Sequence, residues 1–300
     1  MLLLKPLPHR KLKLRRLPSR KLTICIAANA EHGKYLVCAA DTMVASNLAT
    51  TDPLAAKIHF VADWAIMLSG TLGHVDSLVD ALTRRMLSAS DNDPKTIKHL
   101  LETAHREELG SWSAGHYLAP FGLDMPTFLS KGKRYPTQVQ SDLSRSIALG
   151  AEEYDAEIIV CGWGATATSL AQERKSRPYP YIFSADYQGI KLHKTAGLYA
   201  CGSGAPAALS TLYFHNCRPG MDVATVIYYV ATAKFMAERT LGVGPNTVMF
   251  AMKRTGGLVP VTSDHLKQMR KLWIDEGSPR LPNTATALVT SLLGDNLKDD

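Results

Sequence analysis

The apolar residues at the start of the chain fall into short runs that are separated by turn residues. The predicted strands cover 22–30, 35–40, 57–61 and 64–68. Glu31-His32-Gly33-Lys34 joins the first two strands, and Ala62-Asp63 joins the next two. Short β-prone runs on either side of such turns are typical of hairpins. The sequence therefore predicts two β-hairpins before its first helix.

Helical spacing follows these hairpins. Apolar residues recur at three- and four-residue steps over 75–86, which predicts an amphipathic helix. Asp93-Pro94 opens a second helix with a capping residue and a first-turn proline, and this helix ends somewhere in 109–118. The Pro and Gly residues of 119–137 predict a loop. A further helix is expected over 139–149.

The second half of the chain repeats this order of strands and helices. Strands are predicted at 156–161, 182–185, 189–192, 196–200, 246–252 and 258–261. Helices are predicted at 207–215, 223–239 and 264–274. Because strands and helices come in segregated runs, the pattern favours an α+β fold over alternating βαβ units. Two stacked antiparallel sheets, each covered outside by a helix pair, would use every element, so we expect a four-layer αββα sandwich.

The positive charge is concentrated at one end of the chain. The formal net charge is +7, but 8 of the 34 basic residues and none of the 27 acidic residues lie in 1–22. The remaining 26 basic residues balance the acidic ones, which argues against nucleic-acid binding by the body of the protein. We interpret 1–22 as a propeptide, a targeting segment or residues upstream of the true start.

Composition and motifs limit the class of protein that this chain can be. Apolar residues make up 46% of the chain and the mean hydropathy is −0.06, which suits a protein with a sizeable core. No uncharged apolar run approaches the roughly 18 residues of a membrane span, so no membrane partner is expected. Five scattered cysteines favour free thiols and a cytoplasmic location. Without metal-ligand spacing or a phosphate-binding motif, no metal or cofactor is predicted. The tail 277–300 is expected to be loosely held.

Two stretches carry a resemblance to a known family. LTICIAANAEHGKYLVCAADTMVAS and AAKIHFVADWAIMLSGTLGHVDSLVDAL resemble the N-terminal half of proteasome β subunits. They resemble more closely the short proteasome-type N-terminal-nucleophile proteins of prokaryotes that begin Met-Thr. The likeness resumes at AEIIVCGWG, GLYACGSGAPAAL and GPNTVMFAMKR, with an extra stretch near 110–150. It implies one domain over 23–276, hydrolysis of amide bonds in peptide or protein substrates, and a ring-type homo-oligomer.

The resemblance also assigns candidate catalytic residues. In the family an aspartate precedes a catalytic lysine by sixteen positions, as Asp41 precedes Lys57 here. Thr23 matches the nucleophile, and Gly70 matches the glycine whose amide binds the oxyanion. Ser203, within a Gly-Ser-Gly segment, matches a serine that supports the nucleophile. A serine before a helix is equally suited to capping that helix, so both interpretations of Ser203 stay open.

These residue types suit nucleophilic catalysis on physical grounds as well. An N-terminal threonine carries a hydroxyl nucleophile and an α-amine that titrates at about 7.7–8.0 and can accept the hydroxyl proton. The Lys57 ammonium would keep that amine neutral and favour loss of the hydroxyl proton. Asp41 would hold Lys57 charged and oriented, because an opposite charge favours the ionised form. The N–H of Gly70 would stabilise a tetrahedral oxyanion.

The identity of the nucleophile is open between two residues. Thr23 and Cys25 are two apart on one predicted strand, so their side chains share a face. The interval of eighteen residues from Thr23 to Asp41 is two longer than in the family. A longer hairpin at 31–34 would absorb the two residues, whereas without that insertion the nucleophile would be Cys25.

Two departures from the family favour other functions. Thr240 and Val243 lie where the family has a second supporting aspartate and a serine. Leu22 precedes Thr23, whereas proteasome propeptides usually end in glycine. The alternative to an enzyme is therefore a catalytically silent structural or assembly subunit. Binding of nucleic acid or a membrane surface through 1–22 is a third possibility.

Overall fold

The computed structural model describes residues 23–45, 50–51, 57–91, 93–131, 135–164 and 179–277. The interpretation of 1–22 as a leader lies outside these described residues, and so does that of 277–300 as a loosely held tail, apart from its first residue, Gly277.

The first sheet has five antiparallel strands in the order β10-β1-β2-β11-β12. Its strands are β1 (Cys25–Ala30), β2 (Tyr35–Asp41), β10 (Leu198–Cys201), β11 (Thr247–Lys253) and β12 (Leu258–Val261). The predicted turn between the first two strands is confirmed as a short 3-10 turn, Glu31–Gly33. Glu31 and His32 there have left-handed φ angles of 48° and 52°. The hairpin pairs Cys25 with Ala40 and leaves Thr23 just before the sheet.

The second sheet also has five antiparallel strands, in the order β5-β6-β7-β8-β9. Its strands are β5 (Ile58–Val61), β6 (Trp64–Gly70), β7 (Ala156–Gly164), β8 (Tyr179–Asp186) and β9 (Gly189–Leu192). Two further strands, β3 (Val44–Ala45) and β4 (Thr50–Thr51), pair with each other outside both sheets.

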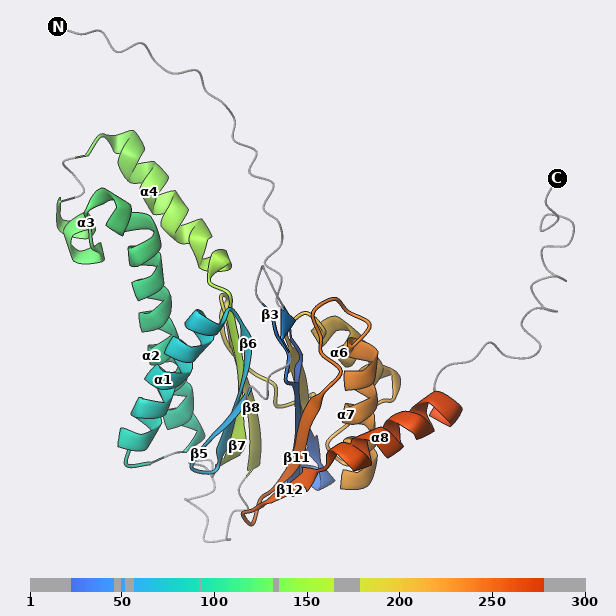
Figure 1. Ribbon diagram of the computed structural model, residues 1–300. Coiled ribbons are helices and arrows are strands. Elements are labelled where there is room, and N and C mark those ends of the chain that lie inside the picture. The colour runs from blue at the N-terminus through green and yellow to red at the C-terminus, as the bar shows by residue number, and fades with distance from the viewer. Residues whose placement is uncertain are drawn as a thin grey trace, which may run out of the picture.

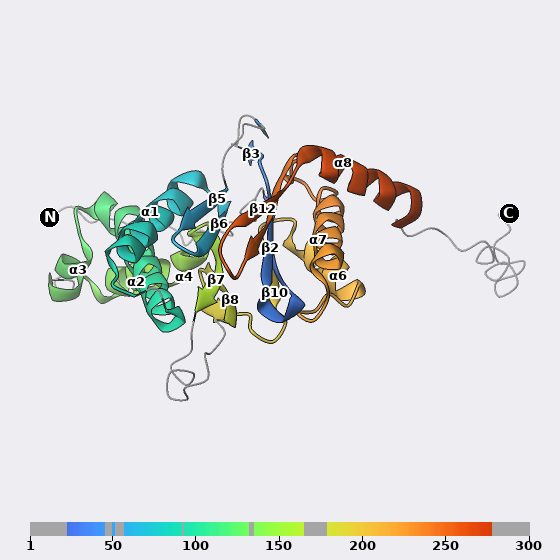
Figure 2. The ribbon, with the colours of Figure 1, turned by 90° about the horizontal axis from the view of Figure 1, so that it is seen from below.

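Helices cover the outer face of each sheet (Figures 1 and 2). Helices α1 (Leu72–Ser88) and α2 (Pro94–Ser113) lie on the second sheet. Helices α6 (Ala205–Phe214) and α7 (Val223–Ala237) lie on the first, and α8 (Ser263–Leu272) packs against α7. The sheets face each other through apolar side chains such as Ala27, Met67 and Ile159. The predicted four-layer αββα sandwich of an α+β protein is confirmed.

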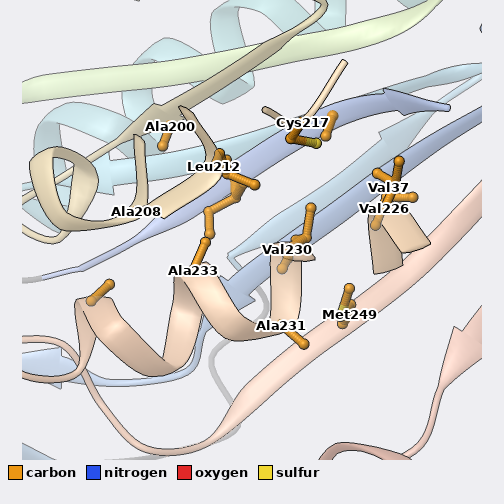
Figure 3. Packing of buried hydrophobic residues seen from close by; sticks show 14 of the residues in the cluster. Val37, Ala200, Ala208, Leu212, Cys217, Val226, Val230, Ala231, Ala233 and Met249 are labelled. Carbon is orange, nitrogen blue, oxygen red and sulfur yellow. The ribbon is translucent and has the colours of Figure 1, made fainter. Parts of the chain in front are cut away.

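Small residues let α7 approach the first sheet closely (Figure 3). Val230, Ala231 and Ala233 of this helix are fully buried against a cluster that includes Val37 and Met249. A helix that is apolar over most of its surface needs burial on more than one side. Helix α7 meets this need between the sheet, α6 and α8.

The predicted loop over 119–137 is wrong in its middle. Gly122, with a left-handed φ of 67°, ends a 3-10 turn, and Asp124 Oδ1 then accepts the amide of Thr127. This hydrogen bond caps a new helix, α3 (Met125–Lys131), in which Pro126 occupies the first turn, where proline is tolerated. Helix α4 (Thr137–Gly150) follows. Both helices extend beyond the sandwich (Figure 1) and share a small apolar cluster with Leu118.

Candidate active site

Three polar side chains meet at one end of the sandwich, between the two sheets. Thr23 precedes β1, Asp41 ends β2 and Lys57 precedes β5. Lys57 Nζ lies 2.7 Å from Asp41 Oδ1 and also donates a hydrogen bond to Thr23 Oγ1. Thr23 Oγ1 donates to the same carboxylate oxygen of Asp41. The three residues are 3%, 1% and 8% exposed. The structure thus brings together three of the predicted site residues.

Both carboxylate oxygens of Asp41 accept hydrogen bonds. Its Oδ1 atom also accepts the amide of Ile24 at 3.1 Å, and its Oδ2 atom accepts the amide of Gly244 at 3.0 Å. A buried ion pair persists only where further hydrogen bonds offset the loss of water. Asp41 meets this condition with two backbone amides. It therefore ties the start of β1 and the Gly244 turn to the ammonium of Lys57.

Cys25 faces the same space between the sheets but has different contacts. Its thiol donates to the carbonyl oxygen of Leu68 at 3.1 Å, and the residue is fully buried among apolar side chains. It is Thr23 that contacts both Lys57 and Asp41. The shared face predicted for the two residues therefore puts a hydroxyl beside the ion pair and a thiol in the core.

The Gly-Ser-Gly segment wraps around the backbone of Thr23. Gly204 N and Ser203 Oγ both donate to the carbonyl oxygen of Thr23, at 3.3 and 3.4 Å. The Ser203 hydroxyl also lies 3.3 Å from the carbonyl oxygen of Leu241. Helix α6 begins after Gly204 without a side-chain cap, so the helix-capping interpretation of Ser203 is wrong. The serine instead contacts the backbone of Thr23.

Gly202 permits this close approach. Its φ is +96°, and a Cβ atom there would lie 2.3 Å from the carbonyl oxygen of Thr23 and 2.9 Å from Ser69 Oγ. Its amide donates to Glu157 Oε2 at 3.1 Å, and Tyr199 donates its hydroxyl to the other oxygen of that carboxylate. Burial, followed by the nearby Glu157 charge, raises the pKa of Tyr199. Glu157 thus holds the backbone of the turn through the amide of Gly202.

Gly70 ends β6 beside this turn. Its φ of +129° is accessible to glycine, and a Cβ atom would lie 2.3 Å from the carbonyl oxygen of Asp155. The next residue, Thr71, donates its amide and its hydroxyl to Asp155 at 2.9 and 3.1 Å. These contacts fix the backbone at the position predicted for the oxyanion donor. The role of Gly70 stays a prediction.

The positions of the two missing family residues are filled differently. Val243 packs its side chain toward Gly204, and Thr240 accepts the amide of Val243. The contact with Asp41 comes instead from the backbone of Gly244. Sequence reasoning missed this contact, and it missed Lys234, which binds the carbonyl oxygen of Gly244. The available signal was a lysine inside the apolar stretch 223–237, with a glutamate four residues later.

Within the described ranges, no three His, Cys, Asp or Glu side chains are arranged to hold a metal ion. No helix among those residues is long and apolar enough to cross a membrane. All five cysteines lie within the described residues, and each is buried and outside any disulfide.

The two stacked sheets with their outer helix pairs form a proteasome-like fold. No protein-family model and no curated protein matches the sequence. Solved structures do match: one is a Gly-1 mutant of Anbu from Hyphomicrobium sp. strain MC1, at a TM-score of 0.56 and 14% identity over 90% of this chain and 99% of that one. Another is Anbu (ancestral beta-subunit) from Yersinia bercovieri, also at 0.56 and 14%, over 87% and 100%. At this identity the comparison establishes the fold alone.

These structures correct one expectation from the sequence. The closer likeness to short prokaryotic proteins that begin Met-Thr is wrong, because the matched structures are Anbu proteins and give no support for a Met-Thr start. The two longest stretches that carry the likeness include the hairpins β1–β2 and β5–β6 of the two sheets, so their residue pattern reflects strand pairing.

Proposed function

We propose that the protein is a proteasome-like hydrolase of peptide amide bonds with Thr23 as its N-terminal nucleophile. The observation that carries this proposal is the contact of Thr23 Oγ1 with both Lys57 and Asp41 in a buried site. A hydroxyl beside a lysine ammonium suits a nucleophile that must lose a proton. In the sequence Thr23 follows Leu22, so the mechanism requires cleavage between these two residues.

The proposed reaction has two halves. In the first, the free α-amine of Thr23 accepts the Oγ1 proton while Oγ1 attacks the substrate carbonyl carbon, and the N–H of Gly70 stabilises the oxyanion. The C–N bond then breaks, and the leaving amine takes the proton from the α-ammonium of Thr23. In the second half, the amine removes a proton from water, which hydrolyses the ester on Thr23 and releases the acid. Oγ1 then regains its proton.

The other site residues have supporting roles in this proposal. The positive charge of Lys57 keeps the α-amine neutral and stabilises the negative charge that develops on Oγ1. Asp41 orients Lys57 through their 2.7 Å ion pair. Ser203 holds the carbonyl group of Thr23, which fixes the position of the nucleophile. No metal or organic cofactor is needed for these steps.

The setting proposed for this activity follows the fold. We expect peptide or protein substrates in the cytoplasm, and a homo-oligomer of the ring type. One of the matched structures is titled a beta-subunit, which supports assembly of copies. A catalytically silent subunit is the second candidate, and it is favoured by the leucine that stands where proteasome propeptides usually have glycine.

The test combines N-terminal sequencing with active-site labelling. Purified active protein should begin at Thr23, and a β-lactone should acylate that residue once per chain. A Thr23→Ala variant of the same mature length is the matched control and should not be labelled. Hydrolysis by a chain that still carries Lys21-Leu22 would refute the threonine mechanism. Mature wild-type protein that neither hydrolyses peptides nor reacts with the lactone would favour the silent subunit.

A further inference from the structure

A buried lysine lies in the last turn of the apolar helix α7. Lys234 is 0% exposed, and its helix neighbours Ala233 and Phe235 belong to the core. Burying an ammonium group in such surroundings is costly unless every proton finds a partner. Burial accordingly lowers the pKa of Lys234, and the charge of Glu238 opposes that shift. Because burying this ammonium costs free energy, the hydrogen bonds of Lys234 need an explanation other than packing of the core.

The ammonium of Lys234 donates three hydrogen bonds to nearby oxygens, one for each of its protons. Two go to consecutive backbone carbonyls, Gly244 O at 2.7 Å and Pro245 O at 2.9 Å. The third goes to Glu238 Oε1, one helical turn further along. Arg270 of α8 binds both oxygens of Glu238, at 2.6 and 2.7 Å. Because Arg270 stays with Glu238, that carboxylate remains paired whether or not Lys234 is present.

The two carbonyls held by Lys234 belong to the turn that holds Asp41. Gly244 donates its amide to Asp41 Oδ2 at 3.0 Å and gives its carbonyl oxygen to Lys234. A Cβ atom on Gly244 would lie 2.6 Å from Met43 Cβ, so the turn has little room to shift on that side. One glycine therefore connects the buried lysine of α7 to the aspartate of the site.

We propose that Lys234 is a positioning residue, which clamps the Gly244–Pro245 turn so that Asp41 stays aligned with Lys57 and Thr23. This inference rests on the proposed function. The clamp acts through backbone atoms, so Lys234 touches neither the nucleophile nor the substrate.

A purely structural lysine would behave differently. Its removal would lower the stability of the fold, because the buried carbonyl oxygen of Gly244 would lose its donor, but it would leave kcat of the folded protein unchanged. Lys234→Met keeps the length of the side chain and leaves Glu238 bound to Arg270. The matched control is Thr232→Val on the same helix, because the buried hydroxyl of Thr232 has no hydrogen-bond partner among the described residues.

The first measurement does not depend on activity. Urea unfolding of full-length wild type, Lys234→Met, Asp41→Asn and the double variant gives the coupling between the two sites. We expect the unfolding equilibrium constant of the double variant to differ from the product of the single effects by about threefold or more, as for residues in one network. Thr232→Val paired with Asp41→Asn should be additive. Additive behaviour of Lys234→Met with Asp41→Asn would overturn the clamp.

The second measurement uses the mature enzyme. Misplacement of a catalytic group by a fraction of an ångström lowers the rate without removing a substrate contact, so kcat of Lys234→Met should fall about tenfold or more while KM changes less than about twofold. Thr232→Val should keep both constants. A folded Lys234→Met protein with wild-type kcat would overturn the proposal.

A milder variant covers the case in which Lys234→Met does not fold. Glu238→Gln keeps the shape of the side chain but removes the negative charge that stabilises the buried ammonium of Lys234, so it should lower kcat by less than Lys234→Met does. Wild-type kcat in Glu238→Gln would then overturn the clamp. The two proposals can also fail separately. If the unfolding cycle shows coupling between Lys234 and Asp41 but mature wild-type protein hydrolyses no peptide, the clamp is supported and the proposed function is refuted.

Discussion

Replacement of Lys57 by methionine tests the centre of the proposed site. The substitution removes the ammonium that contacts Thr23 Oγ1 and Asp41 Oδ1 while it keeps much of the side-chain volume. Preorganised charges that stabilise a transition state are each worth several kcal/mol. We therefore expect kcat/KM of the mature Lys57→Met protein to fall by about 100-fold or more.

The effect on stability can be worked out from the same contacts. Lys57 and Asp41 form a 2.7 Å ion pair whose side chains are 9% and 0% exposed. Removing one partner of such a pair costs about 3–5 kcal/mol. Asp41 keeps the amides of Ile24 and Gly244 and the hydroxyl of Thr23, so the lower end, about 3 kcal/mol, is expected. Asp41→Asn added to Lys57→Met removes the unpaired charge and should restore part of this loss.

The assay pairs urea unfolding with peptide hydrolysis on the same preparations. Lys57→Met should be less stable than wild type and inactive, and the double variant should be more stable than Lys57→Met yet equally inactive. Near-wild-type turnover in a folded Lys57→Met protein would reassign the lysine to a structural role. A double variant less stable than Lys57→Met would show that the charge left on Asp41 is not the source of the cost.

Four further substitutions test other parts of the structure. Thr23→Ala should inactivate the mature protein, whereas Cys25→Ala should keep most activity at some cost in packing; the reverse result in peptide hydrolysis would make Cys25 the nucleophile. Gly202→Ala should destabilise the fold by about 2 kcal/mol or more in urea unfolding, because its Cβ would meet the carbonyl oxygen of Thr23. Burial lowers the pKa of His193 to about 4, so stability should fall as the pH drops from about 6.5 to about 4. His193→Gln should remove on the order of 1–2 kcal/mol of that fall, and an unchanged pH dependence would refute this assignment.

Most of the sandwich could be predicted from the sequence because its strands and helices have clear periodicity. The loop expected over 119–137 shows where that signal fails. Pro126 and Gly122 are typical of loops, but the same residues also suit the end of one helical turn and the start of the next helix. The cap that decides between these outcomes is a single hydrogen bond from Thr127 to Asp124, and its formation depends on the packing of 118–143.

The candidate site was predictable only in part, for a related reason. Thr23 and Asp41 lie at the ends of paired strands, so the β1–β2 hairpin brings them together. Lys57 precedes a strand of the other sheet and reaches them through the packing of the two sheets. Lys234 was not predictable, because it reaches Asp41 through the backbone of Gly244. Contacts made by backbone atoms leave almost no trace in residue types. A buried charge in an apolar helix is the visible part of such an arrangement.

The helices that follow α2 give the molecule a second, smaller unit of cooperativity. Their cluster around Leu118, Phe128 and Leu143 is separate from the three larger cores. Small units of this kind open at a lower free energy than the whole fold, and their amides exchange with solvent earlier. Helix α4 of this unit ends five residues before Asp155, which binds the amide and hydroxyl of Thr71 beside Gly70. Opening of these helices would therefore loosen the chain that leads to Asp155, and with it the end of β6, while the sandwich stays folded.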